Sequence, residues 1–476
     1  MSSAPERRGY EAFGSFHTPS TAELFAGAAA TAVPAPSSFL PPVPTERCRL
    51  DLTSFSSDAK QLFTVDTKRW TYLNHGAFGA PTRYATQVAA AWRDVADRQP
   101  LEFHDRQFFP YAVQAIQALA RFVGVSQPQE LVLLPNATTG LHAVLDSVVR
   151  AELHRPSPTR APVVVCCLST RYGAVNKMLQ ALANDARAAA SNGRRVEIHE
   201  VPLSLAESLD ADTVTSKLDA ALRAIRQQHA TDCALVVVDH VTSNTGVLLP
   251  VDAIVRGCHA QRVRVPVLVD GAHALLNLPL ALDAIGADYY VGNCHKWFAS
   301  PRGAAFLHRR SSAMAMAIAP RVVSHGFFDG LQSAFMWQGL QDYSAWLALP
   351  QCIAFWEHQG VERCREYMHA LAQRAAEHLR AAWDVPAPEP ALVGGHAMQL
   401  VALPSRRIFG VEVNLHAANS SADAKHIQDT LHAEHAIEVP VKCIEGRLYV
   451  RISAHIYNEL ADYDRLARAV ANGHTG

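Results

Sequence analysis

The sequence predicts an α/β protein with a mostly parallel central sheet, helices on both faces and a smaller C-terminal α+β domain. Three observations lead to this prediction. Short, continuous apolar runs alternate with stretches of helical periodicity. Polar residues bound each run, as expected of strands that are buried on both faces of a parallel sheet. The last quarter of the chain changes to long helical stretches and two separate strand-like runs, which indicates a second domain.

Six strand-like runs are expected in the large domain. They are ELVLLP (130–135), PVVVCCL (162–168), ALVVVDH (234–240), VPVLVD (265–270), DYYVGN (288–293) and AAFLH (304–308). Helical stretches lie between them, and in the first of these Leu141, Val144, Leu145 and Val148 follow the spacing of one helix face. Alternating strands and helices of this kind predict an open sheet with right-handed crossovers.

Three parts are expected along the chain. Residues 1–50 are rich in Ala, Ser and Pro and lack periodicity, which predicts a disordered arm. Residues 51–345 are expected to form the large domain, and residues 346–476 the small one. The small domain is expected to combine a long helix over 353–383 with the strands IFGVEVNL and RLYVRIS.

Composition excludes several classes of protein. Of 476 residues, 49% are hydrophobic and 18% are charged, and the formal net charge is −1. This balance provides no basic field for binding nucleic acid or an anionic membrane surface. No apolar run approaches the roughly 20 residues needed to span a bilayer. The nine cysteines form no CxxC pair, which favours a reducing, cytoplasmic location over a disulfide framework.

Polar side chains follow the predicted strands at one edge of the sheet, where open α/β sheets bind ligands. The helix N-terminus at Asn136-Ala137-Thr138 offers free N–H groups to a phosphate. Asp270 can hold a protonated ring nitrogen, and Tyr172 can stack on a planar ring. Lys296 can form a Schiff base with an aldehyde if burial lowers its pKa. Phosphate, ring and aldehyde together describe pyridoxal 5′-phosphate.

Each of these residues also has a structural explanation. Lysine is usually a solvated surface residue, a strand-end aspartate can be an N-cap, and buried histidine, tyrosine and arginine can serve packing or ion pairing. For Lys296 and Asp270 the order of the motifs favours the functional interpretation, whereas for Asn74 and Asn244 neither interpretation is favoured. The histidine-rich stretch HAEH is not a zinc motif, and no metal site is expected.

The succession LNHGAFG, NATTG, YGA, SNTG, VDGAHA, GNCHKW, PRGAAF, SHGF and YVRISAHIYN resembles the class V aminotransferase family of PLP-dependent enzymes. Within that family it is similar to the isopenicillin N epimerase-like proteins and to the hercynylcysteine sulfoxide lyases. The resemblance extends over residues 65–465, nearly all of the chain that is expected to be ordered. It implies the type I fold of PLP-dependent transferases and an amino-acid substrate.

The resemblance assigns roles to the residues around the cofactor ring. Lys296 carries the cofactor as an internal aldimine and moves the Cα proton of the substrate. Asp270 keeps the pyridine nitrogen protonated, His273 lies near the phenolic oxygen and Tyr172 stacks on the ring. Asn244 replaces the proline that is common in this branch and can hydrogen-bond the cofactor oxygen.

The resemblance also assigns roles at the two ends of the bound molecule. Thr138 binds the cofactor phosphate, helped by His295 and Asn293. Arg451 grips the α-carboxylate of the substrate with a bidentate guanidinium, the geometry that suits a carboxylate, and Asn74 lines the same pocket.

The resemblance also implies a homodimer. One position, which relatives use to contact the neighbouring subunit, departs from the family pattern. Where relatives often read GTxD, this chain reads Gly339-Leu340-Gln341-Asp342. In relatives that threonine hydroxyl reaches the cofactor phosphate of the neighbouring subunit, and Leu340 cannot do so.

The cofactor motifs leave the reaction open. We expect a carbon–sulfur β-lyase acting on an S-substituted cysteine, with an amino-acid epimerase as the first alternative and an aminotransferase as another. A cysteine desulfurase is less favoured, because its only candidate nucleophile, Cys443, lies in an expected tight hairpin. A degenerate fold that serves as a scaffold is the non-enzymatic alternative.

Overall fold

The computed structural model describes residues 16–27, 33–43, 55–156, 161–189, 193–311, 317–387, 395–414 and 418–473. A seven-stranded sheet with the order β2-β8-β7-β6-β5-β3-β4 forms the centre of the large domain. Its strands are β2 (Leu131–Leu134), β3 (Val163–Leu168), β4 (Val196–Val201), β5 (Leu235–Asp239), β6 (Val267–Asp270), β7 (Tyr289–Asn293) and β8 (Ala305–Arg309). Only β8 runs antiparallel to its neighbours, so the predicted, mostly parallel α/β fold is confirmed.

All six predicted strands are present, but β4 was not predicted. Its sequence VEIHEV is half polar, because β4 is the edge strand and only Val196 and Val201, at its ends, are buried. A search for continuous apolar runs therefore misses it.

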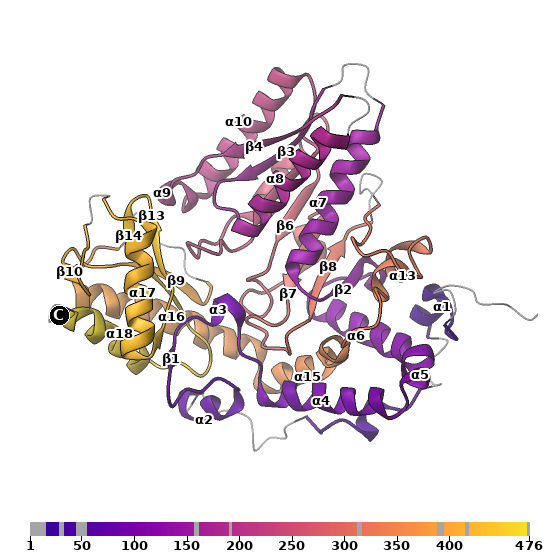
Figure 1. The fold of residues 1–476 in the computed structure, drawn as a ribbon, viewed down its shortest axis with the longest axis horizontal. Helices are drawn as coiled ribbons and strands as arrows, with labels where there is room; N and C mark the ends of the chain where they lie inside the picture. The colour runs from indigo at the N-terminus through magenta and orange to yellow at the C-terminus, as the bar shows by residue number, and fades with distance from the viewer. Residues whose placement is uncertain are drawn as a thin grey trace, which may run out of the picture.

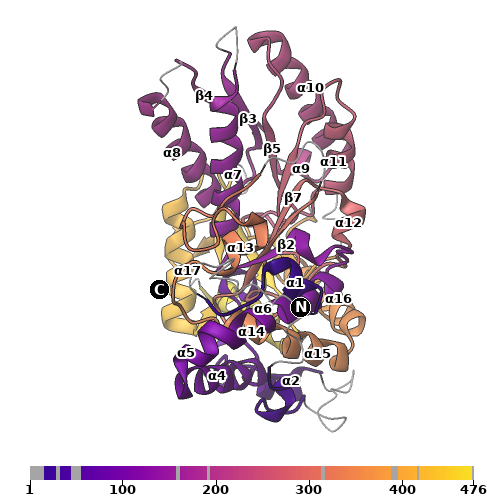
Figure 2. The same cartoon turned by 90° about the vertical axis from the view of Figure 1, so that its right-hand side faces the viewer.

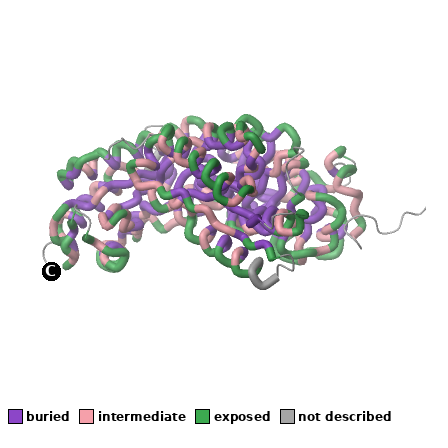
Figure 3. The backbone as a smooth tube through the Cα atoms, turned by 90° about the horizontal axis from the view of Figure 1, so that it is seen from above, coloured by how far each residue is buried: buried purple, intermediate pink, exposed green. Residues whose placement is uncertain are grey.

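Both faces of the sheet are covered by helices, as the apolar runs predicted. In β3 the side chains of Val163, Val165 and Cys167 belong to one core cluster, whereas those of Val164, Cys166 and Leu168 belong to another. Helices α7 (Ala137–His154) and α8 (Gly173–Ala189) cover the first face, and α10 (Ala211–His229) and α11 (Val251–His259) cover the second (Figure 2). Seen from above, buried backbone runs through the middle of the molecule and exposed backbone surrounds it (Figure 3).

The small domain is built around strand β14 (Arg447–Ser453), which pairs on either side with β13 (Val441–Ile444) and β9 (Met398–Ala402). Helices α16 (Val361–Trp383), α17 (Ser421–His435) and α18 (Leu460–Asn472) pack around this sheet (Figure 1). Residues 71–72 also contact the small domain, because β1 (Thr71–Tyr72) pairs in parallel with β12 (Ile437–Glu438) in a separate two-stranded sheet.

The structure corrects two expectations for the small domain. The helix expected over 353–383 is two helices, α15 (Leu349–Gln359) and α16, which are separated by Gly360 with a φ of 82°. The strand expected at IFGVEVNL is a short hairpin of β10 (Arg407–Ile408) and β11 (Val411–Glu412).

The domain boundary at 345/346 stays a proposal, and the packing of α15 suggests moving it. The indole N–H of Trp356 on α15 donates a hydrogen bond to the carbonyl of Phe298, and Phe355 stacks on Tyr84. Because α15 thus packs with the large domain, we propose that the small domain begins with α16.

Within the arm that was expected to be disordered, residues 16–27 and 33–43 pack against the large domain, and the division of the chain at residue 50 stays a prediction. Phe16 contacts Phe109 and Trp337 edge-on, and Phe39 contacts Trp92 in the same way. These aromatic side chains bury enough apolar surface to order a segment whose overall composition is typical of disorder. Residues 1–15, 28–32 and 44–50 lie outside the described residues.

Two further findings concern the whole described chain. No helix in the described ranges is long and apolar enough to cross a membrane. The cysteines in those ranges are free thiols, and all except Cys443 are buried.

Candidate active site

Lys296 lies just beyond the end of β7, in a loop with little freedom. Its Nζ atom is 3.0 Å from Nε2 of His273. Burial, together with the charge of Arg451, lowers the Lys296 pKa to about 8, although Asp270 and Asp239 oppose the shift. The backbone at Gly79 packs directly against this loop. A side chain at Gly79 would place its Cβ only 2.0 Å from the carbonyl oxygen of His295, so there is no room for one. The amine is thus oriented and partly neutral near pH 8.

Asp270 and Asp239 end neighbouring strands directly opposite each other. Both are buried, and burial raises the pKa of each carboxyl group; the charge of Asp270 raises that of Asp239 further. Asp270 accepts the N–H of Ala272 at 3.0 Å, and Lys296 also favours its ionised form. Asp239 Oδ2 is buried without a partner. Sequence reasoning found Asp270 but gave Asp239 no role.

His273 is buried, and its pKa is lowered well below the usual value by burial and by the charges of Lys296 and Arg451. The ring is therefore neutral at physiological pH. Its Nε2 faces Lys296, while Nδ1 has no protein partner. The Cβ position of Gly271, two residues before His273, is filled by the ring of Tyr290 at 2.2 Å, which explains the glycine of the DGAHA motif.

The N-terminus of α7 lies at the same edge of the sheet, and two of its first N–H groups are accepted by asparagine side chains. Asn136 caps the helix by accepting the Thr139 N–H at 2.9 Å. Asn293, at the end of β7, accepts the Ala137 N–H at 2.9 Å. Asn293 thus fixes the helix N-terminus through its carbonyl oxygen, and its expected contact with the phosphate stays a prediction. Thr138 is exposed on the first turn, where an anion is favoured by the helix dipole.

Three other predicted residues lie around this centre. His295 is half-buried with an unpartnered Nδ1, and burial beside Lys296 lowers its pKa to about 4. Tyr172 is 44% exposed, at the end of β3, and its backbone hydrogen bonding lowers the pKa of Asp239. Asn244 is exposed in the loop that follows β5 and lines a cleft between the domains.

Arg451 on β14 is the cation of the site. It is buried, donates through Nη2 to Asn74 Oδ1 at 3.0 Å and donates through Nη1 to the carbonyl of Ser243. No carboxylate within the described ranges pairs with it, and burial lowers its pKa to about 10. Asn74 is held in turn by Glu438 at 3.1 Å. Asn74 and Arg451, which were expected to line one pocket, are thus in direct contact, and their roles toward a ligand stay a prediction.

Two buried histidines that sequence reasoning left without a role hold the Lys296 loop. Nε2 of His75 lies 3.0 Å from the Lys296 carbonyl oxygen, and Nε2 of His455 lies 2.9 Å from that of Trp297. Their rings stack at 4.0 Å, and Nδ1 of His75 lies 2.9 Å from the Tyr457 hydroxyl. The motifs LNHG and RISAHIYN contain these residues, but one sequence gives no signal that they meet.

The donor set fits pyridoxal 5′-phosphate. A lysine amine, a buried carboxylate and a helix N-terminus with the exposed Thr138 match the aldehyde, the ring nitrogen and the phosphate of that cofactor. Several buried polar atoms of the site lack a protein partner, namely Asp239 Oδ2, His273 Nδ1, His295 Nδ1 and Arg451 Nε. These atoms are available to hydrogen-bond a polar ligand in the site.

Several known proteins resemble this chain in sequence or in fold. The family model described as "Aminotransferase class-V" matches residues 188–466. A putative L-cysteine desulfhydrase of Oryza sativa subsp. japonica is 31% identical over 421 residues, covering 84% of this chain and 82% of the relative. An isopenicillin N epimerase of Amycolatopsis lactamdurans is 27% identical over 424 residues, covering 84% and 94%. The solved structure of the cystine C–S lyase C-DES superimposes with a TM-score of 0.64 at 20% identity, covering 85% and 98%.

Fold and site together define a PLP-dependent α/β enzyme with a lysine at a strand end. The family match extends over more than half of the chain. The chain belongs to the class V aminotransferase family, whose members depend on pyridoxal 5′-phosphate.

Proposed function

We propose that this enzyme is a carbon–sulfur β-lyase that acts on an S-substituted cysteine. The observation that carries the proposal is the buried Arg451 guanidinium, which has no carboxylate partner among the described residues and is close enough to lower the pKa of Lys296. An α-carboxylate held at Arg451 places the Cα of an amino acid within range of the lysine. A bidentate guanidinium clamp is the usual way to orient such a group.

Different residues of the chain would hold the cofactor and transfer the proton. Thr138 and the α7 N-terminus would hold the cofactor phosphate, Asp270 the ring nitrogen, and Tyr172 the ring face. When bound, the cofactor supplies an electron sink for negative charge at Cα. Nζ of Lys296 takes the Cα proton, and His273 orients the amine from 3.0 Å. The Cβ–S bond then breaks, sulfur leaves with the electron pair and takes up a proton, and the thiol is released. One water molecule hydrolyses the remaining enamine to pyruvate and ammonia.

The relatives favour a lyase over an epimerase. The rice desulfhydrase is 31% identical to this chain, whereas the epimerase is 27% identical over a similar length. A two-base epimerase also needs a second base on the face of Cα opposite Lys296, whereas His273 lies beside the Lys296 amine itself, at 3.0 Å. Epimerisation through Lys296 alone is the second candidate.

A desulfurase is disfavoured by the position of Cys443. That residue is in β13, paired with Leu448, and its thiol donates to the carbonyl of Asn419 at 3.3 Å. A persulfide-forming cysteine needs a mobile loop that can approach the substrate.

We further propose a homodimer, as the family resemblance implies.

The test is a visible absorption spectrum of the purified protein with added cofactor, with wild type beside Lys296→Ala. We expect a visible band in the wild type that the variant lacks. Adding S-substituted cysteines is expected to shift this band while pyruvate accumulates.

Other outcomes discriminate among the alternatives. Hydrogen exchange at Cα without pyruvate would favour the epimerase. A keto acid that forms only with an amino-group acceptor would favour the aminotransferase. Absence of any lysine-dependent band would contradict the role of Lys296 and support a scaffold.

A further inference from the structure

A cleft of about 550 Å³ separates the two domains beside the candidate active site. Strand-end residues Ser169, Thr170 and Asn244 line one wall, together with α9 (Leu205–Ser208). The N-terminal half of α17 and strand β13 line the other. The volume lies in the range of sites that enclose whole small molecules and exceeds what a thiol group requires.

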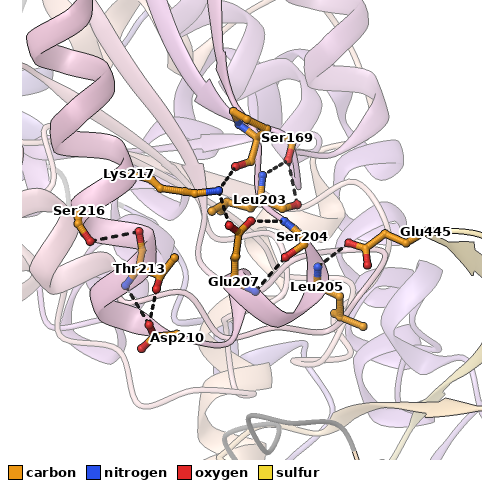
Figure 4. Close-up of polar contacts among 11 residues, drawn as sticks. Ser169, Leu203, Ser204, Leu205, Glu207, Asp210, Thr213, Ser216, Lys217 and Glu445 are labelled. Atoms are coloured by element: carbon orange, nitrogen blue, oxygen red, sulfur yellow. Dashed lines mark hydrogen bonds and ion pairs between the residues drawn. The ribbon is translucent and has the colours of Figure 1, made fainter.

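Polar contacts fix the walls of this cleft (Figure 4). The Leu205 N–H donates to Glu445 Oε1 at 2.7 Å, which joins α9 to the β13–β14 hairpin. Ser204 and Glu207 form the capping box of α9, and Glu207 pairs with Lys217 at 2.5 Å. Glu445, the carboxylate in the cleft lining, thus accepts a backbone N–H through one oxygen, and Glu207 on the neighbouring helix pairs with Lys217.

Lys442 differs from the other charged residues of the cleft. It is half-buried on β13, and the described residues provide no ion pair for its ammonium group. Its pKa is lowered by burial and by the charge of Arg451, with no carboxylate opposing the shift. Lys425, the other lysine in the lining, pairs with Asp429 one turn further along α17. Lys442 is therefore the cation of the cleft that lacks a counter-ion.

The cleft adjoins the groups that would hold the substrate. Lys442 pairs with Tyr449 across the hairpin, which puts it on the same face as Arg451, two residues further along β14. Asn244 follows Ser243, whose carbonyl accepts from Arg451. The hydroxyl of Thr170 is buried without a hydrogen-bond partner. This register and the Ser243–Asn244 connection place the cleft next to Arg451, and the inference below takes a ligand held there to extend toward these groups.

We propose that the cleft binds the sulfur substituent of the substrate and that Lys442 recognises a carboxylate on that substituent. The substrate class is then an S-substituted cysteine whose substituent is extended, polar and anionic. The inference rests on the proposed function, because it takes the α-carboxylate to bind at Arg451. A second carboxylate supplies Lys442 with its missing counter-ion, and charge-assisted hydrogen bonds are about twice as strong as neutral ones.

The test compares S-carboxyethyl-L-cysteine with S-carbamoylethyl-L-cysteine, which match in length and shape and differ in charge. Wild type is expected to prefer the carboxylate by roughly tenfold in kcat/KM. Lys442→Met is expected to bring the ratio close to one, and Lys442→Glu to reverse it. The matched control Lys425→Met removes a lysine that already has a partner, and it should keep the wild-type ratio.

Calorimetric binding separates this inference from the reaction. In the Lys296→Ala protein with cofactor, the carboxylate ligand is expected to bind more tightly than the amide, and adding Lys442→Met should abolish the difference. Equal ratios in wild type and Lys442→Met would overturn the inference even if both compounds release pyruvate. Preferential binding that depends on Lys442 but yields no pyruvate would support the cleft assignment and overturn the lyase reaction.

Discussion

Asp239 and Asp270 stand opposite each other at the ends of two hydrogen-bonded parallel strands. Both are buried, and Asp239 Oδ2 has no partner. Two buried carboxylates at this separation cannot both ionise without a large electrostatic cost. Lys296 and the Ala272 N–H stabilise the Asp270 anion, whereas the charge of Asp270 raises the pKa of Asp239. Backbone N–H groups and Lys296 oppose the upward shift at Asp239, but burial and Asp270 outweigh them. We therefore expect Asp239 to be the protonated member of the pair and Asp270 the ionised one.

This division predicts different effects of isosteric replacement. Asp239→Asn substitutes one neutral group for another and is expected to lower kcat/KM by less than roughly tenfold. Asp270→Asn removes a buried charge, which costs about 2–5 kcal/mol, roughly 30-fold or more. Steady-state kinetics and the absorption maximum of the bound cofactor check both variants. Equal losses in the two would show that the ionised residue has been assigned wrongly.

The lowered pKa of Lys296 predicts a pH dependence. A group with a pKa of about 8 is protonated below that value and becomes the reactive neutral amine above it. The rate at which apoprotein captures added cofactor is therefore expected to rise with pH and level off above about pH 8. Stopped-flow absorbance measures this rate.

Asp270 provides the internal control for that profile. Its carboxylate raises the Lys296 pKa, so Asp270→Asn is expected to shift the midpoint toward lower pH. A midpoint near 10.5, the ordinary value for lysine, would contradict burial of the amine.

Arg451 is expected to determine selectivity for an α-carboxylate. Arg451→Ala leaves that group without its buried partner, at a cost of about 2–5 kcal/mol in transition-state binding. Lysine lacks the planar fork, so Arg451→Lys is expected to recover only part of the loss. The measurement is kcat/KM for an amino acid, and binding of the corresponding amine serves as control. An amine that loses as much affinity as the amino acid would indicate a structural role for Arg451.

His75 is expected to act by positioning Lys296. It is buried, its pKa is lowered well below the usual value by burial, and its ring hydrogen-bonds the Lys296 carbonyl oxygen. His75→Phe keeps the ring but leaves that carbonyl and the Tyr457 hydroxyl unpaired, which costs about 1–3 kcal/mol for each group. Chemical denaturation of the apoprotein is expected to show this loss, and cofactor titration a weaker affinity. Unchanged cofactor affinity at lowered stability would restrict His75 to folding.

The sequence predicted those features that a short run of neighbouring residues determines, and it did not predict contacts between distant segments. Six strands were found because each is a continuous apolar run, and the residues at their ends meet because parallel strands share an edge. Edge strand β4 lacks such a run. The contacts of His75 and His455 with the Lys296 loop join segments that are far apart in sequence. Each histidine contacts a backbone carbonyl oxygen, which every residue type provides, so no residue pattern announces the contact.

Leu340 provides the last prediction. It is 75% exposed. The family resemblance implies that a threonine often stands at this position and reaches the cofactor phosphate of a neighbouring subunit. A leucine there offers no hydrogen bond, while a hydroxyl bonded to a charged phosphate contributes about 1.5–3 kcal/mol. Leu340→Thr is therefore expected to tighten cofactor binding by roughly tenfold or more, measured by fluorescence titration, whereas Leu340→Ala is expected to have little effect. Sedimentation at the same concentrations establishes whether the protein is a dimer. A dimeric Leu340→Thr protein with wild-type affinity would show that this loop does not reach the partner's phosphate site.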